Sequence, residues 1–222
     1  MDPIFRKWQA SPLLARLVPF AIFLGLTFCQ GKFFPGSAYW FYLVKTLVGA
    51  WLVWSMRGVV SEMRFALSWE AVVAGIAVFV LWVGLDGFYR KIGKPGPPWN
   101  PFDQFGNGSP LAWLFVTLRL AGSALIVPPL EEVFYRSFLY RYLISAEFQA
   151  VPFRKFSWMP FLAVSAVFGF EHREWLAGIL CGFAFQGLVL WKGRLGDAMT
   201  AHALTNLLLG LWVVWKGAWN FW

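Results

Sequence analysis

The chain has 222 residues, of which 59% are hydrophobic and only 14% are charged. A soluble domain carries about 25% charged residues, so this composition argues against a water-soluble protein. Aromatic residues make up 20% of the chain, which excludes an intrinsically disordered protein. The net charge of +8 comes from basic residues scattered between apolar runs. This pattern fits contact with an anionic membrane surface better than nucleic-acid binding, so we expect lipid, and no nucleic acid, as a partner.

Apolar runs alternate with short polar connections along the chain. A bilayer core about 30 Å thick needs roughly 20 helical residues. Seven apolar runs are long enough to cross the membrane. Residues 130–144 also favour a helix despite their charges, so the number of crossings is eight if this helix crosses and seven if it does not. The fold class is therefore all-α, a polytopic integral membrane protein forming one domain over residues 1–222. The seven predicted spans are residues 13–30, 38–56, 69–85, 111–129, 156–170, 176–191 and 198–215.

Two features concern the ends of the spans. Residues 86–110 form the main polar loop, because their proline and glycine density forbids a continuous helix. Arg6, Lys7 and Arg16 precede the first apolar run as in a signal peptide, but no small-residue cleavage site follows it. We therefore expect a retained first helix. The distribution of basic residues between alternate connections favours a cytoplasmic N-terminus.

Isolated polar residues in the spans need an explanation, because a charge near the bilayer centre costs about 2.5–3.5 kcal/mol on insertion scales. Lys45 and Arg119 each stand alone in a span. Snorkelling or a structural pair is the interpretation for both. Cys29 and Cys181 lie in or beside apolar runs, which favours buried small hydrophobic residues over a disulfide or metal ligands.

Two adjacent carboxylates and an arginine follow Pro128-Pro129. On a helix Glu132 and Arg136 are four residues apart with the acid first, which is the favourable order for an ion pair. Glu131 points about 100° away, toward another face. Helical geometry thus predicts a paired, structural Glu132 and an unpaired Glu131 available as a general base. The alternative is a solvated helix end with an ordinary ion pair.

The chain contains two histidines, both in late apolar segments. His172 ends the fifth span, and His202 lies one helical turn before Asn206 on the same face. A single histidine in a span is usually an interhelical hydrogen-bonding group. Together with the two carboxylates, however, two imidazoles and an amide would supply a base, an oxyanion donor and groups that orient water.

Other hydrolytic sites find no support in the sequence. A zinc protease of the His-Glu-x-x-His type needs a string that is absent. Ser123 and Ser165 lie in spans but lack the Gly-x-Ser-x-Gly context of a nucleophile elbow. An aspartyl dyad needs two intramembrane aspartates, and every aspartate falls at an end or in a loop. A site built from glutamate and histidine remains.

Three strings in chain order resemble the signature of the CAAX-protease and bacteriocin-processing family (CPBP, or Abi) of intramembrane proteases, which includes the Ras-converting prenyl endopeptidases. The resemblance covers residues 111–209, the motif-bearing core, whereas residues 1–110 hold variable spans and the polar loop. It implies a helical fold around a polar, water-accessible cavity. The compact chain is also similar to bacterial members associated with exosortase-type protein sorting. The strings are Glu131-Glu132-x-x-x-Arg136, Phe168-x-x-x-His172 and His202-x-x-x-Asn206.

The resemblance implies a catalytic role for four residues. Glu131 would activate water with help from His172, and His202 with Asn206 would stabilise the developing oxyanion. No cofactor is expected. If the reaction used a metal, Glu131, His172 and His202 would be the candidate ligands of a zinc ion.

The resemblance also implies that Glu132 and Arg136 support the site by holding the motif helix in place. Two departures from the family pattern stand nearby. Ser137 follows the arginine where the family commonly has glycine, a mild change at a packing position. Charged residues flank His172, which favours a position near the membrane interface.

The favoured function is an intramembrane endopeptidase that hydrolyses a peptide bond near the C-terminus or within the membrane-anchored tail of a protein or peptide. The resemblance favours the inner, or plasma, membrane of a bacterium or archaeon. A proton-coupled transporter is an alternative, because glutamates and histidines form proton relays, although no repeated halves are visible. A non-catalytic immunity or scaffold protein of the same fold is a third reading, but all six motif residues are present. Substrate identity, prenylation and oligomeric state leave no trace in the sequence.

Overall fold

The computed structural model describes residues 10–93 and 96–222, and these residues form helices and no β-strand. The all-α class predicted from the sequence is confirmed. Arg6 and Lys7, which contribute to the prediction of a cytoplasmic N-terminus, lie outside the described residues. The long helices apart from the central one are α2 (Pro12–Cys29), α3 (Ser37–Met56), α4 (Trp69–Gly84), α9 (Trp158–Phe170), α10 (Trp175–Lys192) and α11 (Gly196–Lys216).

One continuous helix of 33 residues, Pro110–Tyr142, forms the centre of the molecule. We call it the central rod. The span predicted at residues 111–129 and the charged helix predicted at residues 130–144 are two parts of this rod, so the charged stretch adds no separate crossing. Its successive parts are α6 (Pro110–Ala121), the π-helix η1 (Gly122–Ile126), α7 (Val127–Glu132), the π-helix η2 (Val133–Leu139) and α8 (Tyr140–Tyr142).

The rod continues past Pro128 and Pro129 for a local reason. A proline has no backbone N–H to donate and its ring crowds the preceding turn. Here the preceding turn is the π-helix η1, in which the N–H of Val127 donates to the carbonyl of Gly122. Such π adjustments are one way in which membrane helices accommodate proline. The carbonyl of Ser123 is thereby left for a partner outside the backbone.

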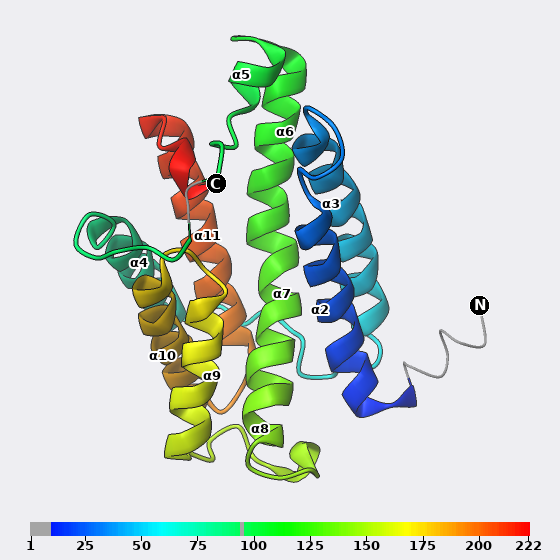
Figure 1. Cartoon of the computed structure of the whole chain (residues 1–222). Coiled ribbons are helices and arrows are strands. Elements are labelled where there is room, and N and C mark those ends of the chain that lie inside the picture. Colours follow the sequence, from blue (N-terminus) through cyan, green and yellow to red (C-terminus); the bar gives the residue numbers. More distant parts are fainter. Residues whose placement is uncertain (1–9, 94–95) are drawn as a thin grey trace.

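The rod separates two groups of helices (Figure 1). On one side α2 and α3 pack together and against the rod, and on the other side lie α4, α9, α10 and α11. Within the second group α11 contacts η1 and α7 directly. The polar loop between α4 and the rod contains the short helix α5 (Pro101–Phe105). The motif residues of α7 therefore face the second group.

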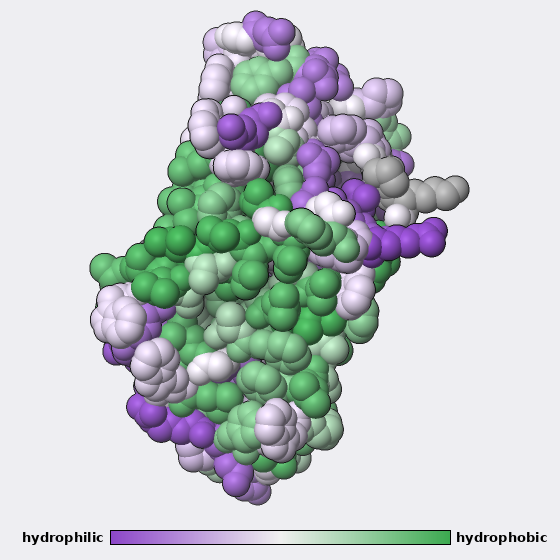
Figure 2. All heavy atoms as spheres, turned by 90° about the vertical axis from the view of Figure 1, so that its left-hand side faces the viewer, coloured by the Kyte–Doolittle hydropathy of each residue, from purple (hydrophilic) through white to green (hydrophobic). Residues whose placement is uncertain are grey.

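The outer surface matches a protein embedded in lipid. Among the described residues, α2, the central rod, α10 and α11 are long and apolar enough, by length and composition, to cross a membrane. The apolar helices α4 and α9 are shorter, with 16 and 13 residues. Figure 2 shows hydrophobic residues over the middle of one face and hydrophilic residues toward both ends. An apolar surface of this extent indicates contact with lipid rather than water.

The helices α9 and α10 approach each other closely at small residues. A Cβ atom added at Gly178 would lie 2.9 Å from the Cα of Gly169, and one added at Gly182 would lie 2.8 Å from the Cα of Ser165. Small residues four apart allow membrane helices to pack backbone against backbone. This contact fixes the end of α9, beyond which His172 follows.

We expect Gly178→Leu to force α9 and α10 apart, because the new side chain would overlap the backbone of Gly169. Overpacking of this kind costs about 1–3 kcal/mol, which corresponds to a melting temperature lower by roughly 2–12 °C in a chain of this size. Thermal unfolding in detergent micelles, followed by tryptophan fluorescence, measures the change. Gly187→Leu is the matched control on the same helix, since a Cβ atom there meets nothing within 4 Å. Equal melting temperatures for the two variants would contradict the prediction.

Candidate active site

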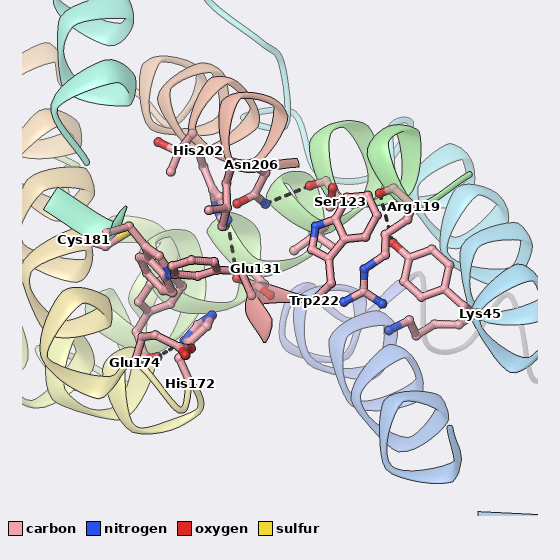
Figure 3. Close-up of a pocket in the computed structure, with 17 residues that line it drawn as sticks. Lys45, Arg119, Ser123, Glu131, His172, Glu174, Cys181, His202, Asn206 and Trp222 are labelled. Carbon is pink, nitrogen blue, oxygen red and sulfur yellow. Dashed lines mark hydrogen bonds and ion pairs between the residues drawn. The ribbon is translucent and has the colours of Figure 1, made fainter. Parts of the chain in front are cut away.

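Residues from the central rod and from both helix groups line a cavity of about 220 Å³. The structure brings to its wall all four residues for which the resemblance implies catalysis. Glu131 comes from α7, His202 and Asn206 come from α11, and His172 comes from the turn after α9. Figure 3 shows Glu131 in the middle of this group, with the two histidines on one side of it.

The two adjacent carboxylates of α7 have different surroundings. Glu131 faces the cavity, and its Oε2 atom accepts no hydrogen bond from the described residues. Glu132 has no exposed surface, and its Oε1 atom lies 3.3 Å from Nη1 of Arg136. The ion pair between Glu132 and Arg136, predicted from helical spacing, is confirmed, and Glu131 has no Lys or Arg partner within 4.0 Å among the described residues.

Glu132 has a second partner that the sequence did not reveal. Its Oε1 atom lies 2.9 Å from Nδ1 of His202. A carboxylate only accepts hydrogen bonds, so Nδ1 carries the proton and donates it. The other ring nitrogen, Nε2, then faces Glu131, whose Oε2 atom is 3.9 Å away. Glu132 therefore does more than hold the motif helix, because it also fixes the tautomer and orientation of the His202 ring.

The side chain of Asn206 is oriented by the irregular turn of the rod. Its Nδ2 atom donates to the carbonyl of Ser123 at 2.8 Å. That carbonyl is the one left by η1 and the proline that follows. A side-chain amide carries two N–H groups, so one bond to Ser123 leaves the other for a substrate oxygen. Pro128 thus contributes indirectly to the position of Asn206.

The ring of His172 is held at the end of α9. Its Nδ1 atom lies 2.9 Å from the carbonyl of Phe168, and because a carbonyl only accepts, Nδ1 is the donor. In the neutral ring this leaves Nε2 as an acceptor. The indole of Trp82 packs edge-on against the ring, with 5.3 Å between the centroids. His172 is thus fixed at the cavity with one nitrogen able to accept a proton.

Two cations that the sequence interpretation treated as structural also line the cavity. Lys45 from α3 and Arg119 from α6 are part of its wall. Snorkelling does not describe Lys45, since its side chain is only 7% exposed. The rarity of a charge within a span was the one sign in the sequence that Lys45 and Arg119 could have a function. Only the folded structure shows that both residues face the same cavity as Glu131.

The donor set at the cavity does not fit a zinc ion in this arrangement. Zinc takes three protein ligands in a catalytic site, with nitrogens at about 2.0–2.1 Å. Among residues 10–93 and 96–222, no three or more His, Cys, Asp and Glu side chains are grouped closely enough to hold a metal. We therefore derive no catalytic step through a metal.

A second buried ionic cluster lies just beyond the motif, outside the cavity. The carboxylate of Glu62 accepts from Nη2 of Arg16 at 2.6 Å and from the hydroxyl of Ser137, and Arg141 lies 3.4 Å away. Ser137 is fully buried, so it is not a mild replacement of glycine, as the sequence suggested, but a partner in this cluster. Burial raises the pKa of Glu62, but the hydrogen bond from Ser137 and the charge of Arg16 outweigh it and hold that pKa below its usual value.

The fold and the site together define a class of protein: a polytopic helical membrane protein with glutamate, histidine and asparagine side chains around a buried cavity. Residues 110–208, a little under half of the chain, match the family model described as type II CAAX prenyl endopeptidase Rce1-like. The match confirms the resemblance to the CPBP family, and the matched segment contains all six motif residues. No curated protein and no solved structure matches the chain.

We expect Glu62→Ala to lower stability by on the order of 3 kcal/mol, because it leaves Arg16 and Arg141 buried without their carboxylate. The folded pKa of Glu62 is depressed, so its contribution is present in full above the unfolded pKa of about 4.3. That contribution is lost as the pH falls through the lower, folded value.

Thermal unfolding in detergent micelles over a pH series measures both effects. The difference in melting temperature between wild type and Glu62→Ala should be constant near neutral pH and shrink below about pH 4. Glu147→Ala, at an exposed carboxylate, is the control and should leave the melting temperature unchanged. A difference that does not depend on pH would contradict the prediction.

Proposed function

We propose that this chain is an intramembrane endopeptidase in which Glu131 activates a water molecule for attack on a peptide carbonyl. The observation that carries the proposal is the position of Glu131, an unpaired carboxylate on the wall of a cavity that also holds two oriented histidines. A structural carboxylate in this setting would have partners of the kind that Glu132 has. The match to an endopeptidase family supports the same activity.

The geometry suggests how the reaction proceeds. Glu131 takes a proton from water while Nε2 of His172 accepts the second hydrogen bond of that water and orients it. The oxygen of the water then attacks the peptide carbonyl carbon. The negative charge that develops on the carbonyl oxygen accepts a hydrogen bond from the free N–H of Asn206. Nε2 of His202 donates a second one when the ring is an imidazolium, with both nitrogens protonated. Glu131 finally passes its proton to the leaving nitrogen as the C–N bond breaks, which yields a carboxylate and an amine.

The size of the cavity limits the substrate that it can hold. At about 220 Å³ the cavity is smaller than the roughly 300–1,000 Å³ of typical small-molecule sites. It therefore accepts only a short stretch of extended peptide. This size is compatible with the cleavage that we propose, near a C-terminus or within a membrane-anchored tail. We further propose an inner or plasma membrane location with the N-terminus in the cytoplasm.

We expect Glu131→Ala to reduce cleavage by at least 100-fold while leaving the melting temperature close to that of the wild type. The adjacent carboxylate is the matched control, because Glu132→Ala leaves Arg136 and His202 without their common partner and should cost about 3–5 kcal/mol of stability. Cleavage of labelled tail peptides by purified protein in detergent, alongside thermal unfolding, measures both. Full activity of Glu131→Ala would contradict the proposal. Proton uptake into proteoliposomes that depends on Glu131, without any cleavage, would favour a transporter instead.

We expect chelators to leave cleavage unchanged, because the proposed water activation uses Glu131 and no metal ligand set. The purified protein is incubated with excess EDTA or 1,10-phenanthroline before the peptide is added, and the initial rate is compared with that of untreated protein. A chelator that acts on the detergent or peptide is detected with a serine protease as the control enzyme. Loss of activity that added zinc restores would show that the reaction depends on a metal.

A further inference from the structure

Two cations lie together on one wall of the candidate active site. Lys45 comes from α3 and Arg119 comes from α6, and both line the cavity that contains Glu131. Figure 3 shows them side by side, with Glu131 between them and the wall that holds His172 and Glu174. The positive wall and the histidine wall therefore lie on opposite sides of the carboxylate proposed to activate water.

Lys45 is buried and Arg119 is partly exposed, and the other buried cations of the described chain are each paired with a carboxylate. Arg16 and Arg141 lie 2.6 and 3.4 Å from Glu62, and Arg136 lies 3.3 Å from Glu132. Lys45 and Arg119 differ, since no described carboxylate oxygen lies within 4.0 Å of either. Pairing with a buried carboxylate, which explains the three arginines, therefore does not explain Lys45 and Arg119.

The hydrogen-bond and ring partners of Lys45 and Arg119 are neutral, and the carboxylate that acts on Lys45 is that of Glu131, farther than 4.0 Å away. Nζ of Lys45 donates to Oε1 of Gln30 at 3.2 Å. The Arg119 guanidinium carbon lies 4.5 Å from the ring centroid of Trp99 and 5.3 Å from that of Trp222. Aromatic rings stabilise a cation by about 0.5–2 kcal/mol, less than a charge costs near the bilayer centre. The two adjacent positive charges also repel each other, so an anion bound between them would stabilise this wall.

We propose that Lys45 and Arg119 bind the free C-terminal carboxylate of the peptide substrate, a specificity that rests on the proposed endopeptidase function. A guanidinium binds a carboxylate through two parallel hydrogen bonds, and an ammonium adds a further donor. With the carboxylate held at this wall, Glu131 reaches a peptide bond at a short, fixed distance from the chain end. The same chemistry would bind the phosphate of an anionic lipid, so the experiment separates these two sources.

The test compares two forms of one substrate pool. N-terminally labelled peptides with a randomised apolar last four residues are made as free acids and as C-terminal amides. Wild type should cleave the free acids with a kcat/KM on the order of 10- to 100-fold higher than the amides. Lys45→Met and Arg119→Gln should each reduce this preference while retaining cleavage of the amides. Lys216→Met removes an exposed cation that packs on Trp215 outside the cavity, and it should keep the preference of the wild type.

Binding measured without turnover separates this inference from the proposed function. In a Glu131→Gln background, fluorescence anisotropy should show tighter binding of the free acids, and Lys45→Met should abolish the difference. If this difference appears but the wild type cleaves neither pool, the carboxylate site stands and the proposed function fails. If the wild type cleaves both pools equally and binding is equal, the function stands and the carboxylate site is overturned. Equal binding of the two pools, together with binding of phosphatidylglycerol nanodiscs that depends on Lys45, would assign the wall to lipid phosphate instead.

Discussion

The buried charge of Glu132 is the constraint on which the geometry of the site depends. Its side chain has no exposed surface, and an unpaired carboxylate in such a position is very costly. Arg136 supplies one partner from the rod, and His202 supplies the other from α11. The rod and α11 cannot slide apart without breaking the hydrogen bond from His202 and leaving the buried charge of Glu132 with Arg136 alone. The position of the His202 ring at the cavity is therefore a consequence of a structural requirement.

A second constraint comes from two prolines placed directly before the motif. They force a π-turn into the rod, and this turn frees the carbonyl to which Asn206 donates. Turns of this kind occur often at functional sites, where they change which backbone and side-chain groups face a neighbour. The irregular turn and Glu132 act on the same helix, α11, one fixing Asn206 and the other fixing His202. Two side chains one turn apart are thus held from two points of the rod.

The sequence predicted the features that depend only on neighbouring residues, namely the helix ends and the spacing of side chains on one helix. The predicted spans outside the rod agree with the helix ends to within two residues, because each apolar run ends at polar, proline or glycine residues. Helical spacing also separated Glu131 from Glu132. Three features depend on contacts between distant segments and could not be predicted: continuity past Pro128-Pro129, the burial of Ser137 against Glu62, and the meeting of Lys45 with Arg119. The membrane location of a single charge is visible in the sequence, but its partner is not.

The state of pairing distinguishes two kinds of buried charge in this chain. Glu132 with Arg136, and Glu62 with Arg16, are compensated within the protein, and their value lies in joining helices. Glu131, Lys45 and Arg119 form no ion pair within 4.0 Å with a described Lys, Arg, Asp or Glu side chain, and all three face the cavity that also holds the histidines. A bilayer makes an uncompensated charge costly, so such charges persist where a reactant or ligand completes them. In a chain with so few charges, an uncompensated residue at a cavity is therefore a stronger indication of function than its position in a motif alone.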